Sequence, residues 1–270
     1  MKRIVTYILF FSSWTLSLAQ VQTRDGYFEN IQLITTGLTD TLYKELNYAR
    51  THPKEYQDTM EKYINGFIEY YDTTKAKDKQ DYEYAKTYSM LDVEKRDPLI
   101  RDPQLEKIAQ MRALDMTINE HCGHLDKRGE YVDYYISEAG IRTDGIRKIR
   151  RTIPSKKKRP IDMRDPKTYK YVYSYATNQN SSESCTAVPK QPKVLGEPES
   201  RYDMIRSLIF SPPHRNHLLS EDELHKNDWA IGIGIARRED AETISYYCAV
   251  IIVNRTDIKK DQIIDTWSSK

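Results

Sequence analysis

The residues in this chain that could do chemistry are two histidines and a glutamate. His124 closes a His-Cys-Gly-His segment, Glu183 is the single acid of a Ser-Ser-Glu-Ser-Cys turn, and His214 follows two prolines. Two imidazoles and a carboxylate suffice to hold a divalent transition metal, or to do acid-base work on a bound ligand. Neither histidine belongs to a His-Glu-x-x-His motif, which would carry its own general base.

An amphipathic helix is expected to position the first histidine. Asp102 and Pro103 are a capping residue and a first-turn proline, and an apolar stripe follows them. The stripe consists of Leu105, Ile108, Ala109, Ala113 and Met116. The His-Cys-Gly-His segment comes at the C-terminal end of this helix, where the helix dipole favours a protonated imidazole. A histidine that only caps the helix is the alternative interpretation.

A second helix and a β-hairpin surround His214. Pro212 and Pro213 are expected to end an apolar helix that starts at Met204, so that His214 lies just beyond it. The apolar runs 229–236 and 244–253, on either side of a charged segment, predict a β-hairpin. Gly232 and Gly234 leave one face of the first strand without side chains, so that something can approach its backbone closely. We interpret this strand as the floor under a site, with the glycines as packing positions rather than phosphate contacts.

Two more helices are predicted before these elements. The first has Thr39 or Asp40 as its cap, and Leu42, Leu46 and Ala49 along one face. The second runs from Pro53 to Gly66, with Tyr56, Met60, Tyr63 and Ile64 facing inward. From about residue 67 to 97 the pattern dissolves into Tyr, Lys, Asp and Thr, which predicts an exposed insertion with some helix at most.

A second insertion is predicted at about residues 141–180, and its first half is basic. Nine basic residues and one acidic residue lie between Arg142 and Arg159. A solvated loop is the simpler interpretation, and a patch for phosphate or an anionic surface is the alternative. The segment has too few aromatic residues to stack bases, so no nucleic-acid partner is expected.

The N-terminus has the pattern of a secretory signal peptide over residues 1–19. Lys2 and Arg3 precede an apolar stretch, and Ser-Leu-Ala at 17–19 is a small-residue cleavage site. Removal of these two charges from the formal net charge of +2 leaves a nearly neutral chain. No other long apolar run occurs. We therefore expect a secreted protein, extracellular or periplasmic, with no transmembrane segment after signal removal.

Three cysteines are an odd number for an oxidising compartment. We expect one disulfide, between Cys122 and Cys185, with Cys248 as a buried free thiol. A cysteine hydrolase that uses Cys122 or Cys185 with His124 is disfavoured, because the disulfide would consume the nucleophile.

The order of these segments resembles the CAP superfamily, also called the SCP-like extracellular domain, in its bacterial form. The matching segments are Leu-Asn-Tyr-Ala-Arg at 46–50 with Pro53, Pro-Leu at 98–99, the two histidines and the glutamate, Ser-Pro-Pro-His-Arg at 211–215, Ile-Gly-Ile-Gly at 231–234 and Tyr-Tyr at 246–247. The chain departs from the family at Ser184, where asparagine is usual, and at Leu208, where many members have tryptophan. No second glutamate completes the two-His, two-Glu cavity of many animal members.

The resemblance implies an α+β fold, a three-layer α-β-α sandwich with a central, mostly antiparallel sheet flanked by helices. The CAP domain would span residues 33–253, after a lead-in at 20–32 and before a polar, peripheral tail at 254–270. The resemblance also implies that His124, Glu183 and His214 line one cleft, in which His124 and His214 could hold a divalent metal such as zinc.

The function implied by the resemblance is non-catalytic, because most of the family has no established enzymatic activity. We expect a binding module for an extracellular ligand, lipid, peptide or protein. The alternative is a metal-dependent or acid-base extracellular hydrolase that acts on peptide or cell-wall material. The absence of a Gly-x-Ser-x-Gly elbow and of a glycine-rich nucleotide fingerprint disfavours a serine hydrolase and a nucleotide enzyme.

Overall fold

The structure, a computed structural model, describes residues 18–22, 28–143, 146–154, 169–177 and 182–262. In these residues helices combine with a mostly antiparallel open sheet, which confirms the α+β class. The sheet has the order β1-β2-β7-β8-β6, and a short strand, β3, pairs in parallel with β7. Its strands are β1 (Leu18–Gln22), β2 (Phe28–Ile34), β3 (Ile100–Arg101), β6 (Glu183–Pro192), β7 (Ala230–Glu239) and β8 (Thr243–Val253).

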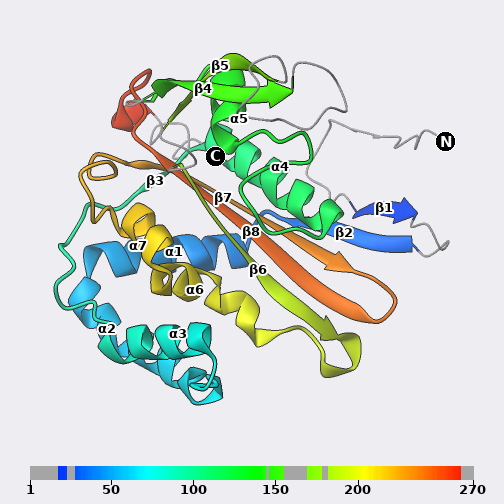
Figure 1. Cartoon of the computed structure of the whole chain (residues 1–270), viewed down its shortest axis with the longest axis vertical. Helices are drawn as coiled ribbons and strands as arrows, with labels where there is room; N and C mark the ends of the chain where they lie inside the picture. Colours follow the sequence, from blue (N-terminus) through cyan, green and yellow to red (C-terminus); the bar gives the residue numbers. More distant parts are fainter. Residues whose placement is uncertain (1–17, 23–27, 144–145, 155–168, 178–181, 263–270) are drawn as a thin grey trace.

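Strands β7 and β8 form the predicted hairpin, and their turn is closed by Asp240. Its Oδ1 accepts hydrogen bonds from the amides of Glu242, at 2.9 Å, and Thr243, at 2.6 Å. Helix α4 (Pro103–Asn119) lies along one face of this hairpin (Figure 1). Asp102 caps the helix as predicted, because its Oδ1 accepts a hydrogen bond of 2.8 Å from the amide of Gln104.

The glycines of β7 allow α4 to contact the strand at backbone distance. A Cβ atom at Gly232 would lie 2.2 Å from the carbonyl carbon of Leu105, and one at Gly234 would lie 2.1 Å from that of Ala109. Both glycines are therefore packing positions, as expected. The interpretation of this strand as the floor of a site is wrong at these two residues, since a helix covers them.

The opposite face of the sheet carries the main core. Ile231, Ile233 and Ile235 alternate with the glycines and are buried against α1, α2, α6 and α7. Figure 1 shows α4 and α5 on one side of the sheet and α1, α6 and α7 on the other. These helices are α1 (Leu38–Thr51), α2 (Pro53–Asn65), α5 (Val132–Glu138), α6 (Met204–Phe210) and α7 (Pro212–Leu219).

Two predicted helix boundaries differ from the structure. Helix α1 begins one residue before Thr39, and Asp40 lies inside its first turn, where its side chain accepts a hydrogen bond of 3.3 Å from the amide of Gly37. Pro212 and Pro213 do follow the end of α6, but they also open α7, so His214 lies in a helix and not beyond one. Proline is compatible with a first helical turn because the amides there have no intrahelical partner.

The first predicted insertion contains some helix, but it is not exposed along its whole length. It holds a 3-10 turn (Ile68–Tyr70) and helix α3 (Ala76–Thr87). Tyr88 and Met90 are buried in the main core, and the amide of Met90 donates a hydrogen bond of 2.6 Å to the side chain of Gln57. The segment is therefore joined to the core at its C-terminal end.

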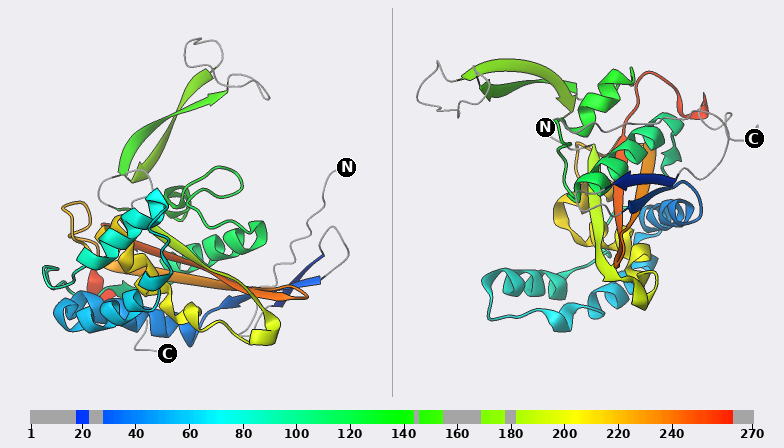
Figure 2. Two further views of the ribbon diagram at one scale, coloured as in Figure 1. Left: turned by 60° about the horizontal axis from the view of Figure 1, so that its bottom comes forward. Right: turned by 90° about the vertical axis from the view of Figure 1, so that its right-hand side faces the viewer.

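The basic segment is not a loop throughout its length. Strands β4 (Ile146–Pro154) and β5 (Tyr169–Thr177) pair in nine antiparallel positions and form a separate two-stranded sheet. Figure 2 shows this hairpin standing out from the rest of the molecule. Residues 144–145, 155–168 and 178–181 of the predicted insertion lie outside the described residues. Short 3-10 turns at Lys193–Leu195 and Glu199–Asp203 lead from β6 into α6.

The described residues at the two ends of the chain can be compared with the predicted signal peptide and the predicted peripheral tail. Residues 1–17 of the expected signal peptide lie outside the described part of the chain, and residues 18–22 form β1. The tail is peripheral only in part, because Arg255 is buried and donates a hydrogen bond of 2.5 Å to the capping residue Asp102. Among the described helices, none combines the length and the apolar character that a membrane span requires.

Candidate functional site

The three residues singled out in the sequence come together at the edge of the sheet that strand β6 forms. His124 lies in the loop after α4, Glu183 is the first residue of β6, and His214 lies in the first turn of α7. His124 Nδ1 is 3.2 Å from Glu183 Oε2, and the centroids of the two imidazole rings are 6.0 Å apart. We call these three residues the His/Glu site.

A buried arginine on α4 holds Glu183 in place. Arg112 Nε donates to Glu183 Oε1 at 2.8 Å, and both side chains are almost completely buried. The same guanidinium donates through Nη2 to the carbonyl oxygen of Gly123 at 2.8 Å. Arg112 therefore ties the carboxylate to the loop that carries His124. The sequence interpretation missed this residue, although a charge in the middle of an apolar stripe is a recognisable signal.

His214 is a neutral imidazole under physiological conditions. Burial and the neighbouring His124 lower its pKa to about 4. Its Nδ1 atom is buried and has no hydrogen-bond partner among the described residues. A buried polar atom without a partner costs about 1–3 kcal/mol. A ligand that accepts or donates at this nitrogen, or a metal ion, would remove that cost.

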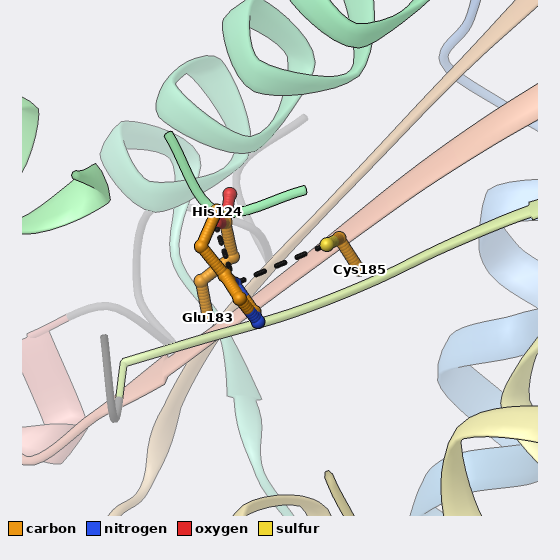
Figure 3. Close-up of side chains that lie close together, drawn as sticks. All are labelled: His124, Glu183 and Cys185. Carbon is orange, nitrogen blue, oxygen red and sulfur yellow. Dashed lines mark hydrogen bonds and ion pairs between the residues drawn. The ribbon is translucent and has the colours of Figure 1, made fainter. Parts of the chain in front are cut away.

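A cysteine adds a sulfur atom to the site. Cys185 lies two residues after Glu183 on β6, and its Sγ is 3.9 Å from His124 Nδ1 (Figure 3). The donor atoms of His124, Glu183 and Cys185 lie within 4.8 Å of one another, so these residues could hold a metal ion. Nitrogen, oxygen and sulfur donors together suit zinc better than magnesium or calcium.

The predicted disulfide is absent from the structure, in which Cys122, Cys185 and Cys248 are all free thiols. Cys122 and Cys185 nevertheless influence each other's pKa. A hydrogen bond between their side chains lowers the pKa of Cys122, and this bond together with burial raises the pKa of Cys185. Cys248 is fully buried within the sheet, which raises the pKa of its thiol.

A second group of possible metal ligands lies in the interior. His217, His225 and Asp228 also place donor atoms within 4.8 Å of one another. Their hydrogen bonds are satisfied within the protein: His217 contacts Ser184 Oγ at 2.8 Å and the carbonyl of Ile252 at 3.2 Å, and His225 contacts Asp228 at 2.9 Å. Through these contacts His217 fastens α7 to β6 and β8. We read this group as a structural network.

Acidification is expected to destabilise the protein through His217. Burial, and then His225, lower the pKa of His217 well below its usual value. The unfolded chain therefore takes up a proton below about pH 6.5 that the folded protein refuses, and stability falls as the pH drops from there. Urea titrations between about pH 7.5 and 5 should show a shallower decline for His217→Gln than for the wild type. Equal slopes would contradict this assignment.

A groove elsewhere on the molecule has none of the three His/Glu-site residues in its lining. It has a volume of 560 Å³ and lies among α2, β6 and α6, where Phe67, Val188 and Met204 contribute apolar atoms. Arg206 also lines this groove, and its Nε lies 2.7 Å from Glu45 Oε1. The support for the predicted cleft is therefore the proximity of His124, Glu183 and His214 to one another, because this groove contains none of them.

Comparisons of the chain with known protein families, with curated proteins and with solved structures find no match. The resemblance to the CAP superfamily therefore stays a prediction that rests on the motifs and their order.

Proposed function

We propose that this protein is an exported, non-catalytic binding module of CAP type, with a three-layer α-β-α arrangement. Three features support the proposal: the order of the motifs, the helices on both faces of a mostly antiparallel sheet, and the meeting of His124, Glu183 and His214 at the sheet edge. The module binds a divalent metal such as zinc at the His/Glu site. A lipid, peptide or protein partner outside the cell would then bind at or beside this metal.

The observation that carries the proposal is the unpartnered nitrogen of His214. A metal ion needs a neutral imidazole with a free lone pair, and the low pKa of about 4 for His214 supplies the neutral form. The ring of His124 lies 6.0 Å from that of His214, and its Nδ1 is within hydrogen-bonding distance of Glu183. A carboxylate that orients a ligating histidine is a common element of zinc sites.

The setting of Glu183 favours binding over catalysis. Its carboxylate is fully buried, and its oxygens are engaged by Arg112 at 2.8 and 3.4 Å and by His124 at 3.2 Å. A general base needs a lone pair directed at the substrate or at an attacking water. Both oxygens of Glu183 are directed at Arg112 and His124 instead, so the carboxylate positions these two side chains.

Zinc titration of the metal-stripped mature protein tests the proposal. We expect one zinc ion per chain by calorimetry, and loss of that binding in the double variant His124→Ala, His214→Ala. The matched control is His52→Ala, which removes an exposed histidine that lies between α1 and α2. Binding that survives in the double variant, or that the control also loses, would refute the assignment of the site.

An extracellular hydrolase is the second candidate, and the separation of the two rings favours it. Imidazoles with centroids 6.0 Å apart can hold one metal ion and leave a position open for water. Hydrolysis of peptide or cell-wall material that requires zinc and both histidines would establish this activity. Turnover that persists in the double variant would exclude it.

A further inference from the structure

The hairpin of β4 and β5 carries positive charge that no acid within its strands balances. The two strands contain five basic residues and no acidic one; the basic residues are Arg147, Lys148, Arg150, Arg151 and Lys170. Helix α5 lies next to β5, and Figure 2 shows the hairpin extending away from the body of the molecule. A projecting segment with charge of one sign attracts a polyanion and speeds its association.

The register of the two strands gathers tyrosines and cations on one face. Lys148 is paired with Tyr175, and Arg150 is paired with Tyr173. Directly paired residues lie on the same face of an antiparallel ribbon, and so do alternate residues of one strand. This face therefore holds four tyrosines of β5, at positions 169, 171, 173 and 175, together with Lys148 and Arg150 of β4. We call it the tyrosine face.

The pairing of β4 with β5 removes the reason for expecting no nucleic-acid partner. That expectation came from residues 142–159, which contain no aromatic residue of their own to stack bases. Strand β5 supplies four, and on one face of a strand successive positions are about 6.6 Å apart. Proteins that bind single-stranded nucleic acid without sequence preference combine such a row of aromatic residues with positive charge along the path of the phosphates.

We propose that the β4–β5 hairpin binds single-stranded nucleic acid, with bases stacked on the tyrosine face and phosphates paired with Lys148 and Arg150. The opposite face, with Arg147, Arg151 and Lys170, adds attraction at longer range. A duplex fits this surface less well, because its bases are already stacked on one another. A bilayer of anionic phospholipid would attract the same cations, but it has no repeat for a periodic row of rings to match. This activity is independent of the His/Glu site.

The test measures binding of a fluorescein-labelled oligothymidylate of about 12 nucleotides to the purified protein, by fluorescence anisotropy at a series of salt concentrations. Replacing Tyr171 and Tyr173 with valine keeps a strand-forming residue at each position and should weaken binding at least about fivefold for each ring removed. The double variant Tyr171→Phe, Tyr173→Phe keeps both rings and should bind like the wild type. Lys148→Gln with Arg150→Gln should reduce the slope of log affinity against log salt by about 1.4, since each phosphate contact on a single strand contributes about 0.7.

The matched charge control is Lys77→Gln, Lys79→Gln, which removes the same charge from exposed positions of α3 and should leave affinity and salt slope nearly unchanged. An equal loss in this control, or equal affinities of the valine and phenylalanine variants, would overturn the proposal. Polyphosphate has the charge but no bases, so competition as strong as that of unlabelled oligothymidylate at equal phosphate concentration would also overturn it. Binding to phosphatidylglycerol vesicles without binding to the oligonucleotide would assign the hairpin to a lipid surface instead.

Discussion

Replacing Arg112 with methionine is expected to lower the free energy of unfolding by about 3–5 kcal/mol. The guanidinium is 1% exposed and neutralises Glu183, whose side chain is 0% exposed. Methionine fills much of the same volume but leaves a carboxylate buried without a counter-charge. It also removes the hydrogen bond of 2.8 Å to the carbonyl of Gly123, which holds the loop that carries His124. Urea denaturation of chelator-treated protein gives the measurement.

Two further variants isolate the electrostatic cause. Adding Glu183→Gln to Arg112→Met removes the buried charge and should recover a large part of the loss. Lys75→Met is the matched surface control, since its ion pair with Asp72 is exposed to solvent and is expected to contribute little to stability. If Arg112→Met costs no more than this control, the ion pair with Glu183 does not stabilise the fold.

The elements predicted from the sequence are those with a local signal. The cap and first-turn proline at Asp102 and Pro103 define the start of α4, and two apolar runs around a polar turn define the β7–β8 hairpin. The β4–β5 hairpin shows the limit of this approach. Tyrosines alternate along β5 at 169, 171, 173 and 175, which is the period of a strand, but the dense basic charge of β4 has no such period.

The sequence predicted which residues form the site, but not the contacts that hold their side chains in place. The motifs indicate His124, Glu183 and His214, and the structure brings these three together. Arg112 repeats with the apolar stripe of α4, so its charge has to be buried, yet its partner lies 71 residues away. Such a pairing depends on how α4 crosses the sheet, which is a tertiary property. The hydrogen bond between His217 and Ser184, which are 33 residues apart in the sequence, has the same origin.

Substituting Gly234 with alanine is expected to destabilise the protein by about 3 kcal/mol or more, because α4 leaves no room for a side chain. A Cβ atom there would lie 2.1 Å from the carbonyl carbon and oxygen of Ala109 and 2.3 Å from the amide nitrogen of Gln110. These are main-chain atoms, so no rotamer change relieves the overlap and the helix itself has to move. Urea denaturation measures the loss.

The same displacement should weaken metal binding, since α4 carries Arg112 and leads into the loop with His124. We therefore expect Gly234→Ala to reduce zinc affinity under conditions in which the protein is still folded. Ala109→Gly should not rescue it, because the overlap involves the backbone and not the alanine methyl group. Gly66→Ala is the control: its φ of −67° suits alanine and the nearest atom to a new Cβ is 3.3 Å away, so its effect should stay within about 1 kcal/mol. Equal effects of Gly234→Ala and Gly66→Ala would mean that α4 does not rest on the β7 backbone, and that Arg112 and the His124 loop are positioned by other contacts.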